Sequence, residues 1–173
     1  MHTNLYLSLE FQKPNKDWSF FIQFPDTGYM HVLQTLLGNE TGDEIIPKGN
    51  CLTPKGFPPD VDVKSIEEDS YIIDNNAANS DIGEIINTVR FCSREDANEW
   101  VEKDKSFLIK RGYGVTDPEA FGHSWVSSSE LKNLLHLCEK YKEQGDYIVR
   151  AIIAVMESLE NDGFNARVVY WFS

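Results

Sequence analysis

The stretch Val168-Val169-Tyr170-Trp171-Phe172, almost at the end of the chain, decides the fold. Its side chains are apolar at consecutive positions, so a strand formed here is expected to lie centrally or to be covered on both faces. Near the other end, residues 5–11 alternate apolar and polar side chains, which is typical of a half-buried strand. Because short chains tend to tie down their termini in the core, we expect these two strands to be neighbours.

Two helices are predicted between residues 127 and 163. Ser127 and Glu130 form a capping-box pattern, and apolar residues follow at helical spacing to about Tyr141. A second helix is expected from Asp146, with an apolar surface wide enough for the main core, until Asn161-Asp162-Gly163 ends it. The sequence therefore predicts a single α+β domain over residues 1–173, with a mainly antiparallel sheet and two C-terminal helices packed on one face.

The middle of the chain carries weaker signals. A short helix is predicted over Tyr29–Leu37, with Gly38 as the glycine expected just after its end. Strands are predicted over residues 85–91 and 107–109, and a short surface helix begins between them after the N-cap Ser93. These elements add to the α+β pattern.

The charge is strongly acidic and unevenly distributed. The chain has 28 acidic and 16 basic residues, a formal net charge of −12, and residues 1–86 hold 14 acids against 5 bases. Nucleic-acid backbones are bound by clustered lysines and arginines, so direct binding of DNA or RNA is disfavoured. Residues 60–84 contain eight acids and a single base, Lys64. A solvated face explains this stretch most simply. An imitation of nucleic acid that occupies a basic partner is the alternative.

The cysteines and the lack of long apolar segments also indicate the cellular compartment. Cys51, Cys92 and Cys138 are odd in number and not closely paired, so reduced thiols are expected. The first residues lack the basic and long apolar segments of a signal peptide, and no apolar run approaches the ~20 residues that cross a bilayer. We therefore expect a soluble, cytoplasmic protein with no membrane partner.

His123 and Ser124, with Asp117 six residues before His123, could supply a base and a nucleophile. Adjacent side chains rarely point at one another and no Gly-x-Ser-x-Gly elbow is present, so a structural role is favoured. In that role both side chains bond backbone groups ahead of the helix, and Trp125 packs onto the core. The histidines lack metal-ligand spacing and no nucleotide-binding fingerprint occurs, so no catalytic residue, metal or cofactor is predicted.

Two unusual connections, residues 47–62 and 111–127, are expected to carry the binding groups, because each precedes a helix start that turns back over one end of the sheet. The second contains Arg111-Gly112-Tyr113-Gly114, which could cradle a phosphate or stack on a base, although a flexible turn is the simpler interpretation. Lysine and arginine give this surface a local positive character. The predicted surface consists of Lys55, Phe57, Asp60, Arg111, Tyr113, His123 and Trp125.

Several segments, in the same order over most of the chain, resemble a family of small phage and prophage proteins. The family shares an irregular Pro-Gly segment, a His-Ser-containing Trp motif before a helix, and an apolar C-terminal strand. The resembling segments are Lys55-Gly56-Phe57-Pro58-Pro59-Asp60, Ser93-Arg94-Glu95-Asp96-Ala97-Asn98-Glu99-Trp100-Val101, Val115-Thr116-Asp117-Pro118, His123-Ser124-Trp125, Ser129-Glu130-Leu131 and Arg167-Val168-Val169-Tyr170-Trp171-Phe172. The resemblance implies a phage context and brings no established activity with it.

The predicted function is that of a non-catalytic, phage-type binding protein that engages a host protein or a small, nucleotide-like ligand and thereby counters a host defence. A long irregular surface without a catalytic constellation favours it. One alternative is a hydrolase or nucleotide-modifying enzyme centred on His123, with Ser124 and Asp117 beside it and Arg111 holding an anion. The other alternative is the acidic nucleic-acid mimic.

Overall fold

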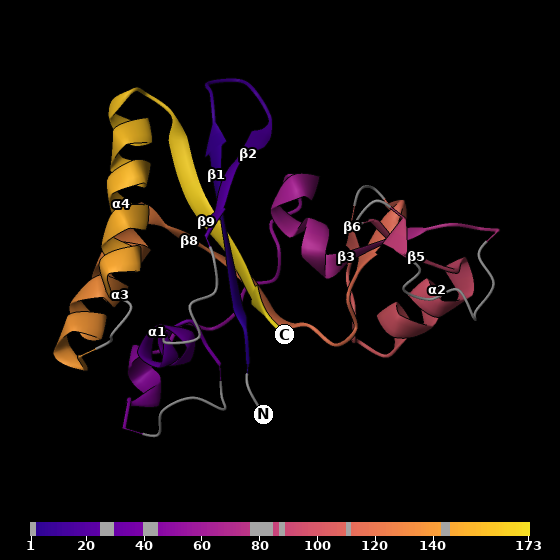
Figure 1. The fold of residues 1–173 in the computed structure, drawn as a ribbon, viewed down its shortest axis with the longest axis horizontal. Coiled ribbons are helices and arrows are strands. Elements are labelled where there is room, and N and C mark those ends of the chain that lie inside the picture. The colour runs from indigo at the N-terminus through magenta and orange to yellow at the C-terminus, as the bar shows by residue number, and fades with distance from the viewer. Residues whose placement is uncertain are drawn as a thin grey trace. The chain divides into compact units, whose positions relative to one another are not determined.

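The computed structural model describes residues 3–24, 30–39, 45–76, 85–86, 89–109, 112–142 and 146–173. The chain divides into two compact units, one made of Met1–Ser65 with Gly122–Ser173 and the other of Ile66–Phe121. Both units combine helices with strands, which confirms the predicted α+β class (Figure 1). The single domain over residues 1–173 stays a prediction, and each unit is described by itself.

The first unit is built on a four-stranded sheet with the order β2-β1-β9-β8. Its strands are β1 (Leu5–Gln12), β2 (Trp18–Phe24), β8 (Phe121–Ser127) and β9 (Asn165–Phe172). β1 pairs antiparallel with β2 and with β9, and the register between β1 and β9 runs from Leu5 opposite Phe172 to Gln12 opposite Asn165. The first and last strands are therefore neighbours, as predicted (Figure 1).

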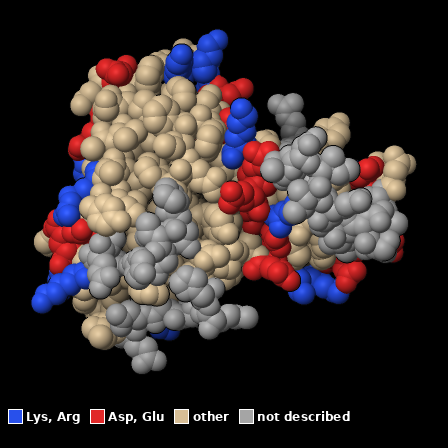
Figure 2. Space-filling view, in the orientation of Figure 1, with Lys and Arg blue, Asp and Glu red and all other residues tan. Residues whose placement is uncertain are grey.

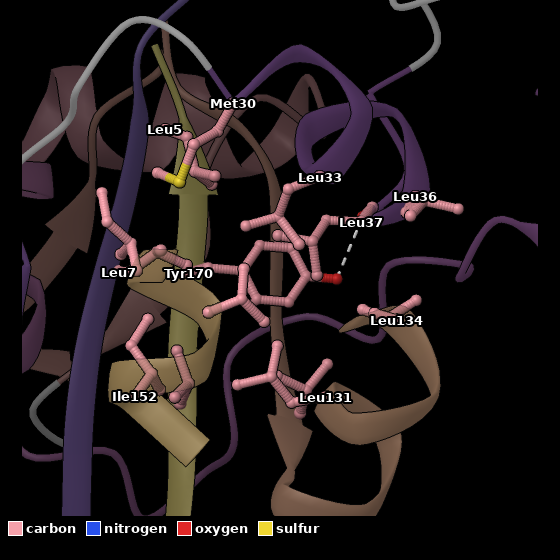
Figure 3. Close-up of a cluster of buried hydrophobic side chains, with 14 of the residues drawn as sticks. Leu5, Leu7, Met30, Leu33, Leu36, Leu37, Leu131, Leu134, Ile152 and Tyr170 are labelled. Carbon is pink, nitrogen blue, oxygen red and sulfur yellow. Dashed lines mark hydrogen bonds between the residues drawn. The ribbon is translucent and has the colours of Figure 1, made fainter. Parts of the chain in front are cut away.

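One face of this sheet is covered by α1 (His31–Leu36), α3 (Ser128–Lys140) and α4 (Asp146–Asn161). The predicted capping box starts α3: the Ser127 hydroxyl accepts the Glu130 N–H, and the Glu130 carboxylate accepts the Ser127 N–H at 2.8 Å. Figure 3 shows Tyr170 of β9 reaching into the leucine-rich core, where its hydroxyl donates to the Leu37 carbonyl at 3.0 Å. Burial raises the pKa of Tyr170 to about 12.

The outer side of α3 and α4 carries charges of both signs, seen at the left of Figure 2. The Lys132 ammonium of α3 lies 2.6 Å from the Glu157 carboxylate of α4, and Arg150 of α4 lies 3.3 Å from Glu139 of α3. Exposed pairs of this kind contribute little to stability, but they keep this side hydrated and leave the apolar sides for the sheet. Among the described residues, no helix combines the length and apolar character needed to cross a membrane.

The end of α1 depends on a glycine. The helix ends at Leu36, close to the predicted end, and the predicted first residue, Tyr29, lies outside the described residues. Gly38 follows with φ of +100°, and a Cβ atom there would lie 2.7 Å from the carbonyl oxygen of Leu52. Glycine is therefore needed both for the left-handed backbone and for the close approach of the next segment.

The second face of the same sheet is covered by an irregular segment, residues 53–62, which we call the strap. Side chains on this second face alternate along β1 and β9 with those that face the helices. Four of them are nevertheless buried: Ser8, Glu10, Val169 and Trp171. The strap places the Phe57 ring 5.9 Å from the Trp171 ring, and buries Pro58 beside it. β9 is thus covered on both faces, as its consecutive apolar residues predict.

The second unit is a five-stranded sheet with the order β4-β5-β3-β7-β6. Its strands are β3 (Ser70–Ile73), β4 (Ile85–Ile86), β5 (Val89–Cys92), β6 (Leu108–Ile109) and β7 (Gly114–Thr116). β3 and β5 are parallel, whereas the pairs β3–β7, β4–β5 and β6–β7 are antiparallel. Helix α2 (Arg94–Glu102) begins at the predicted N-cap Ser93, whose hydroxyl accepts the Asp96 N–H at 3.0 Å. It closes a small core of Ile73, Cys92, Ala97 and Val115.

Two sequence expectations in the middle of the chain need correction. The strand predicted over residues 85–91 is two strands, since β4 and β5 pair antiparallel with Ile85 opposite Arg90. Apolar β-branched residues stand on both sides of the reversal, so the pattern of polarity gives no sign of it. Residues 111–127, predicted as an irregular connection, contain β7 and β8. Glycines and mixed polarity concealed these strands because neither segment alternates cleanly.

Candidate functional site

The candidate site lies where the strap runs beside strand β8 in the first unit. The Gly56 N–H donates to the His123 carbonyl at 2.8 Å, and the Lys55 N–H donates to the Ser124 hydroxyl at 3.0 Å. Gly56 has φ of +79°, a conformation that glycine adopts without strain. The strap therefore follows the edge of β8 and brings together four predicted site residues that are distant in sequence, Lys55 with Trp125 and Phe57 with His123. The fifth predicted residue described in this unit, Asp60, lies at the other end of the strap and binds Arg167.

Two predicted site residues remain, Tyr113 and Arg111. Tyr113 belongs to the second unit, between β6 and β7, and its side chain is exposed. Arg111 lies outside the described residues. The expectation that all seven residues border one surface stays a prediction.

Lys55 forms the exposed end of the site. Its ammonium lies 2.9 Å from the Glu130 carboxylate and 4.1 Å from the centre of the Trp125 ring. Partial burial alone would raise the pKa of Glu130, but the Ser127 N–H and the Lys55 ammonium outweigh it and hold that pKa below its ordinary value. The charge of Lys55 is thus balanced by a carboxylate that also caps α3.

His123 lies in an aromatic row rather than in an open site. Its ring is 4.7 Å from the Phe57 ring in an edge-on arrangement, and only 5% of the residue is exposed. Phe57 in turn meets the edge of Trp171, which stacks on Tyr6 at 5.0 Å. A general base must reach the proton that it removes. This ring is instead held against Phe57, which fixes the strap to the sheet.

Ser124 and Asp117 also have structural contacts. Ser124 is fully buried and its hydroxyl is occupied by the Lys55 N–H. Asp117 belongs to the second unit, where its carboxylate binds the Arg90 guanidinium, which also lies 4.2 Å over the Tyr71 ring. These contacts give the candidate nucleophile and the candidate acid defined roles in the fold.

A buried charge cluster lies under the other end of the strap, around Arg167 of β9. The Arg167 Nε donates to Glu10 Oε2 at 2.7 Å, and Nη1 donates to Asp60 Oδ1 at 2.9 Å. The guanidinium also lies 3.9 Å over the ring of Trp18. The Arg167 side chain is 6% exposed and that of Glu10 is fully buried, whereas the Asp60 side chain is 60% exposed. The cluster therefore has a buried inner pair and an exposed outer partner.

Glu10 also holds the strap through its second oxygen. Oε1 accepts the Asp62 N–H at 2.7 Å, and the Asp62 carboxylate accepts the Phe20 N–H of β2 at 3.1 Å. Burial raises the pKa of Glu10 above its ordinary value, although Ser65, Arg167 and Asp62 act in the opposite direction. One buried carboxylate thus connects β1, β9 and the strap.

Sequence reasoning missed Glu10, Arg167 and Trp18 as members of the site. A signal was present for the first two. If β9 is covered on both faces, its neighbour β1 must also be covered, so Glu10 becomes buried and needs a cation. Arg167 stands directly before the apolar run that places β9 in the centre of the sheet. Trp18 has no comparable signal, since its position depends on the pairing of β2 with β1.

Within the described residues, no group of three or more His, Cys, Asp and Glu side chains is arranged to hold a metal ion. Comparisons of the chain with models of protein families, with curated proteins and with solved structures find no match.

Proposed function

We propose that this chain is a non-catalytic binding protein whose partner is a protein of a bacterial host. The observation that carries the proposal is a set of large apolar side chains exposed on the hairpin of β6 and β7. Tyr113 is 71% exposed, Leu108 53% and Phe107 51%. Aromatic residues at the surface are enriched in protein interfaces, where a few of them supply most of the binding energy.

The backbone of this hairpin supports the same use. β6 is an edge strand of the second unit, and the Thr116 N–H donates to the Phe107 carbonyl at 3.0 Å. The backbone N–H and C=O groups of successive residues in an antiparallel strand point to opposite sides of the strand. Because those of Phe107 face β7, the N–H and C=O groups of Leu108 point away from it. An extended segment of a partner can add to such an edge and gain backbone hydrogen bonds.

The contacts of the candidate catalytic groups favour binding over catalysis. The His123 ring is buried against Phe57, Ser124 is fully buried, and Asp117 is paired with Arg90. The phage context of the proposal comes from the sequence resemblance alone. A reducing, cytoplasmic location is supported by the three cysteines, none of which forms a disulfide bond in the described structure.

The acidic stretch has internal roles that favour the simpler interpretation of its charge. Asp60 binds Arg167, Asp62 accepts two backbone N–H groups, and Asp69 is buried. Asp81 and Glu84 lie outside the described residues. We therefore place the partner surface on the hairpin and not on the acidic stretch.

The experiment compares capture of a host protein by the wild-type chain and by a Leu108→Ser, Tyr113→Ser variant. The captured protein is identified, purified and titrated against both chains. We expect the double variant to bind at least about tenfold more weakly, since both side chains are truncated at the centre of the proposed contact.

A Tyr147→Ser variant is the matched control, because Tyr147 is an exposed aromatic residue of α4 in the first unit. It should bind as the wild type does. Equal affinity for the wild-type chain and the Leu108, Tyr113 double variant would contradict the proposal.

A further inference from the structure

The two ends of the Arg167 guanidinium are held differently. The inner Nε edge is fixed by Glu10 in the interior of the first unit. The outer end reaches the strap, where Nη1 binds the Asp60 carboxylate and Nη2 lies 3.3 Å from the Asp60 carbonyl oxygen. The outer partner is thus a surface residue that contributes both a side-chain and a backbone oxygen.

The guanidinium is held by two contacts besides those with Asp60. Glu10 holds one edge at 2.7 Å and the Trp18 ring lies over one face at 3.9 Å, so its plane and direction are set by β1 and by Trp18 of β2. A guanidinium that is fixed in this way presents its remaining N–H groups to a planar acceptor without further loss of freedom. This is the arrangement of a preformed carboxylate site.

Asp60 occupies that arrangement incompletely. A carboxylate can accept hydrogen bonds from both terminal nitrogens of an arginine in parallel. Here Nη1 donates to the side-chain oxygen of Asp60, and Nη2 donates to its backbone carbonyl oxygen. With Asp60 in place, the three side chains carry one net negative charge; without it, Glu10 and Arg167 balance each other. An incoming carboxylate would therefore replace the Asp60 charge rather than add to it.

We propose that Arg167 is a binding site for a carboxylate group and that Asp60 fills this site in the free protein. The ligand is a carboxylate borne by a peptide, either at its C-terminus or on an acidic side chain. Displacement of Asp60 would release only its own part of the strap, which stays attached before Asp60 by Phe57 and by the Lys55 and Gly56 N–H groups, and after it by the Asp62 N–H on Glu10. This inference concerns the first unit and does not rest on the hairpin of the second.

The test is a titration of an Asp60→Ala variant with acetate, in which the NMR signal of the Arg167 Nε–H is monitored. An internal ligand competes at high effective concentration, so we expect the variant to bind acetate at least tenfold more tightly than the wild-type chain. Asp60→Asn, which keeps the side-chain volume while removing the charge, should shift in the same direction. Asp162→Ala, which removes an exposed acid at the end of α4, is the matched control and should behave as the wild type.

Three peptides then identify the source of the carboxylate: pentaglycine with a free C-terminus, pentaglycine amide, and an amidated form with one glutamate. Binding of the first or the third, with pentaglycine amide inactive, supports the inference and names the source. Equal binding of the amide, preference for inorganic phosphate over acetate, or an unchanged Arg167 signal in the Asp60→Ala chain would overturn it. The Leu108→Ser, Tyr113→Ser chain should keep the acetate response of its parent, so failure of either proposal is seen separately.

Discussion

Replacement of Arg167 by methionine tests how strongly the buried pair stabilises the first unit. Methionine has an unbranched side chain of similar length, so much of the packing of the arginine stem remains. The Glu10 carboxylate, fully buried and 2.7 Å from Arg167 Nε, then loses its cation. Removal of one member of a buried pair costs about 3–5 kcal/mol, because the other is left uncompensated. We expect Arg167→Met to lower the free energy of unfolding by about that amount.

The second half of this test adds Glu10→Gln to the Arg167→Met chain. The amide oxygen still accepts the Asp62 N–H, and no uncompensated charge remains in the interior. The double variant should therefore recover at least about half of the loss. Urea denaturation followed by tryptophan fluorescence measures each free energy, with Arg150→Met on the exposed side of α4 as the control, at about 1 kcal/mol or less. The reasoning fails if Arg167→Met costs no more than Arg150→Met, or if Glu10→Gln makes it worse.

Further variants test the pH dependence of stability and the backbone at Gly38. Glu10→Gln should flatten the dependence of the free energy of unfolding on pH. The pKa of Glu10 is raised in the folded protein, so its stabilising contribution is complete below the ordinary pKa of 4.5 and is lost as pH rises through the folded pKa. Urea denaturation at pH values across this transition measures the effect, and identical pH profiles for the variant and the wild type would contradict it. Glu130→Gln has the opposite sign, because the folded pKa of Glu130 is lowered; its contribution is present above 4.5 and is lost as pH falls through the folded pKa. At neutral pH this variant should lose at most about 1 kcal/mol, because the glutamine oxygen can still accept the Ser127 N–H but the Lys55 ammonium loses its charged partner. A full wild-type acid transition in this variant would contradict the assignment. Gly38→Ala should lower the free energy of unfolding, measured by thermal denaturation, by more than about 1 kcal/mol. The loss should exceed that of Gly163→Ala, since Gly163 has a similar φ of +85° but no atom within 4 Å of the added Cβ. Equal losses would contradict a role for the close approach of Leu52.

Parts of the fold that depend on local chemistry were predictable. The capping box needs only Ser127 and Glu130, which are three residues apart, and the end of α1 needs only Gly38. The pairing of β1 with β9 was also accessible, because the apolar run of residues 168–172 requires a central position. These elements are specified by residues that lie close together or by a requirement for burial on both faces.

The site itself could be predicted only in part, because its contacts join distant positions. Arg167 and Glu10 are separated by 157 positions, and neither carries a local signal for the other. β8 was missed because His123, Ser124 and Trp125 do not alternate in polarity, although His123 and Ser124 are both buried where the strap runs beside this strand. The division into two units likewise depends on which long-range contacts form, and neither composition nor spacing marks its boundaries at residues 65–66 and 121–122.

Hydrogen exchange of the chain with and without its captured host protein tests the central claim, that this is a binding protein whose contact lies on the β6 and β7 hairpin. We predict that amide exchange slows at residues 107–109 and 113–116 when the partner binds, and that the amides of α4 are unchanged. Slowed exchange confined to other parts of the chain, with the hairpin amides unaffected, would contradict the account.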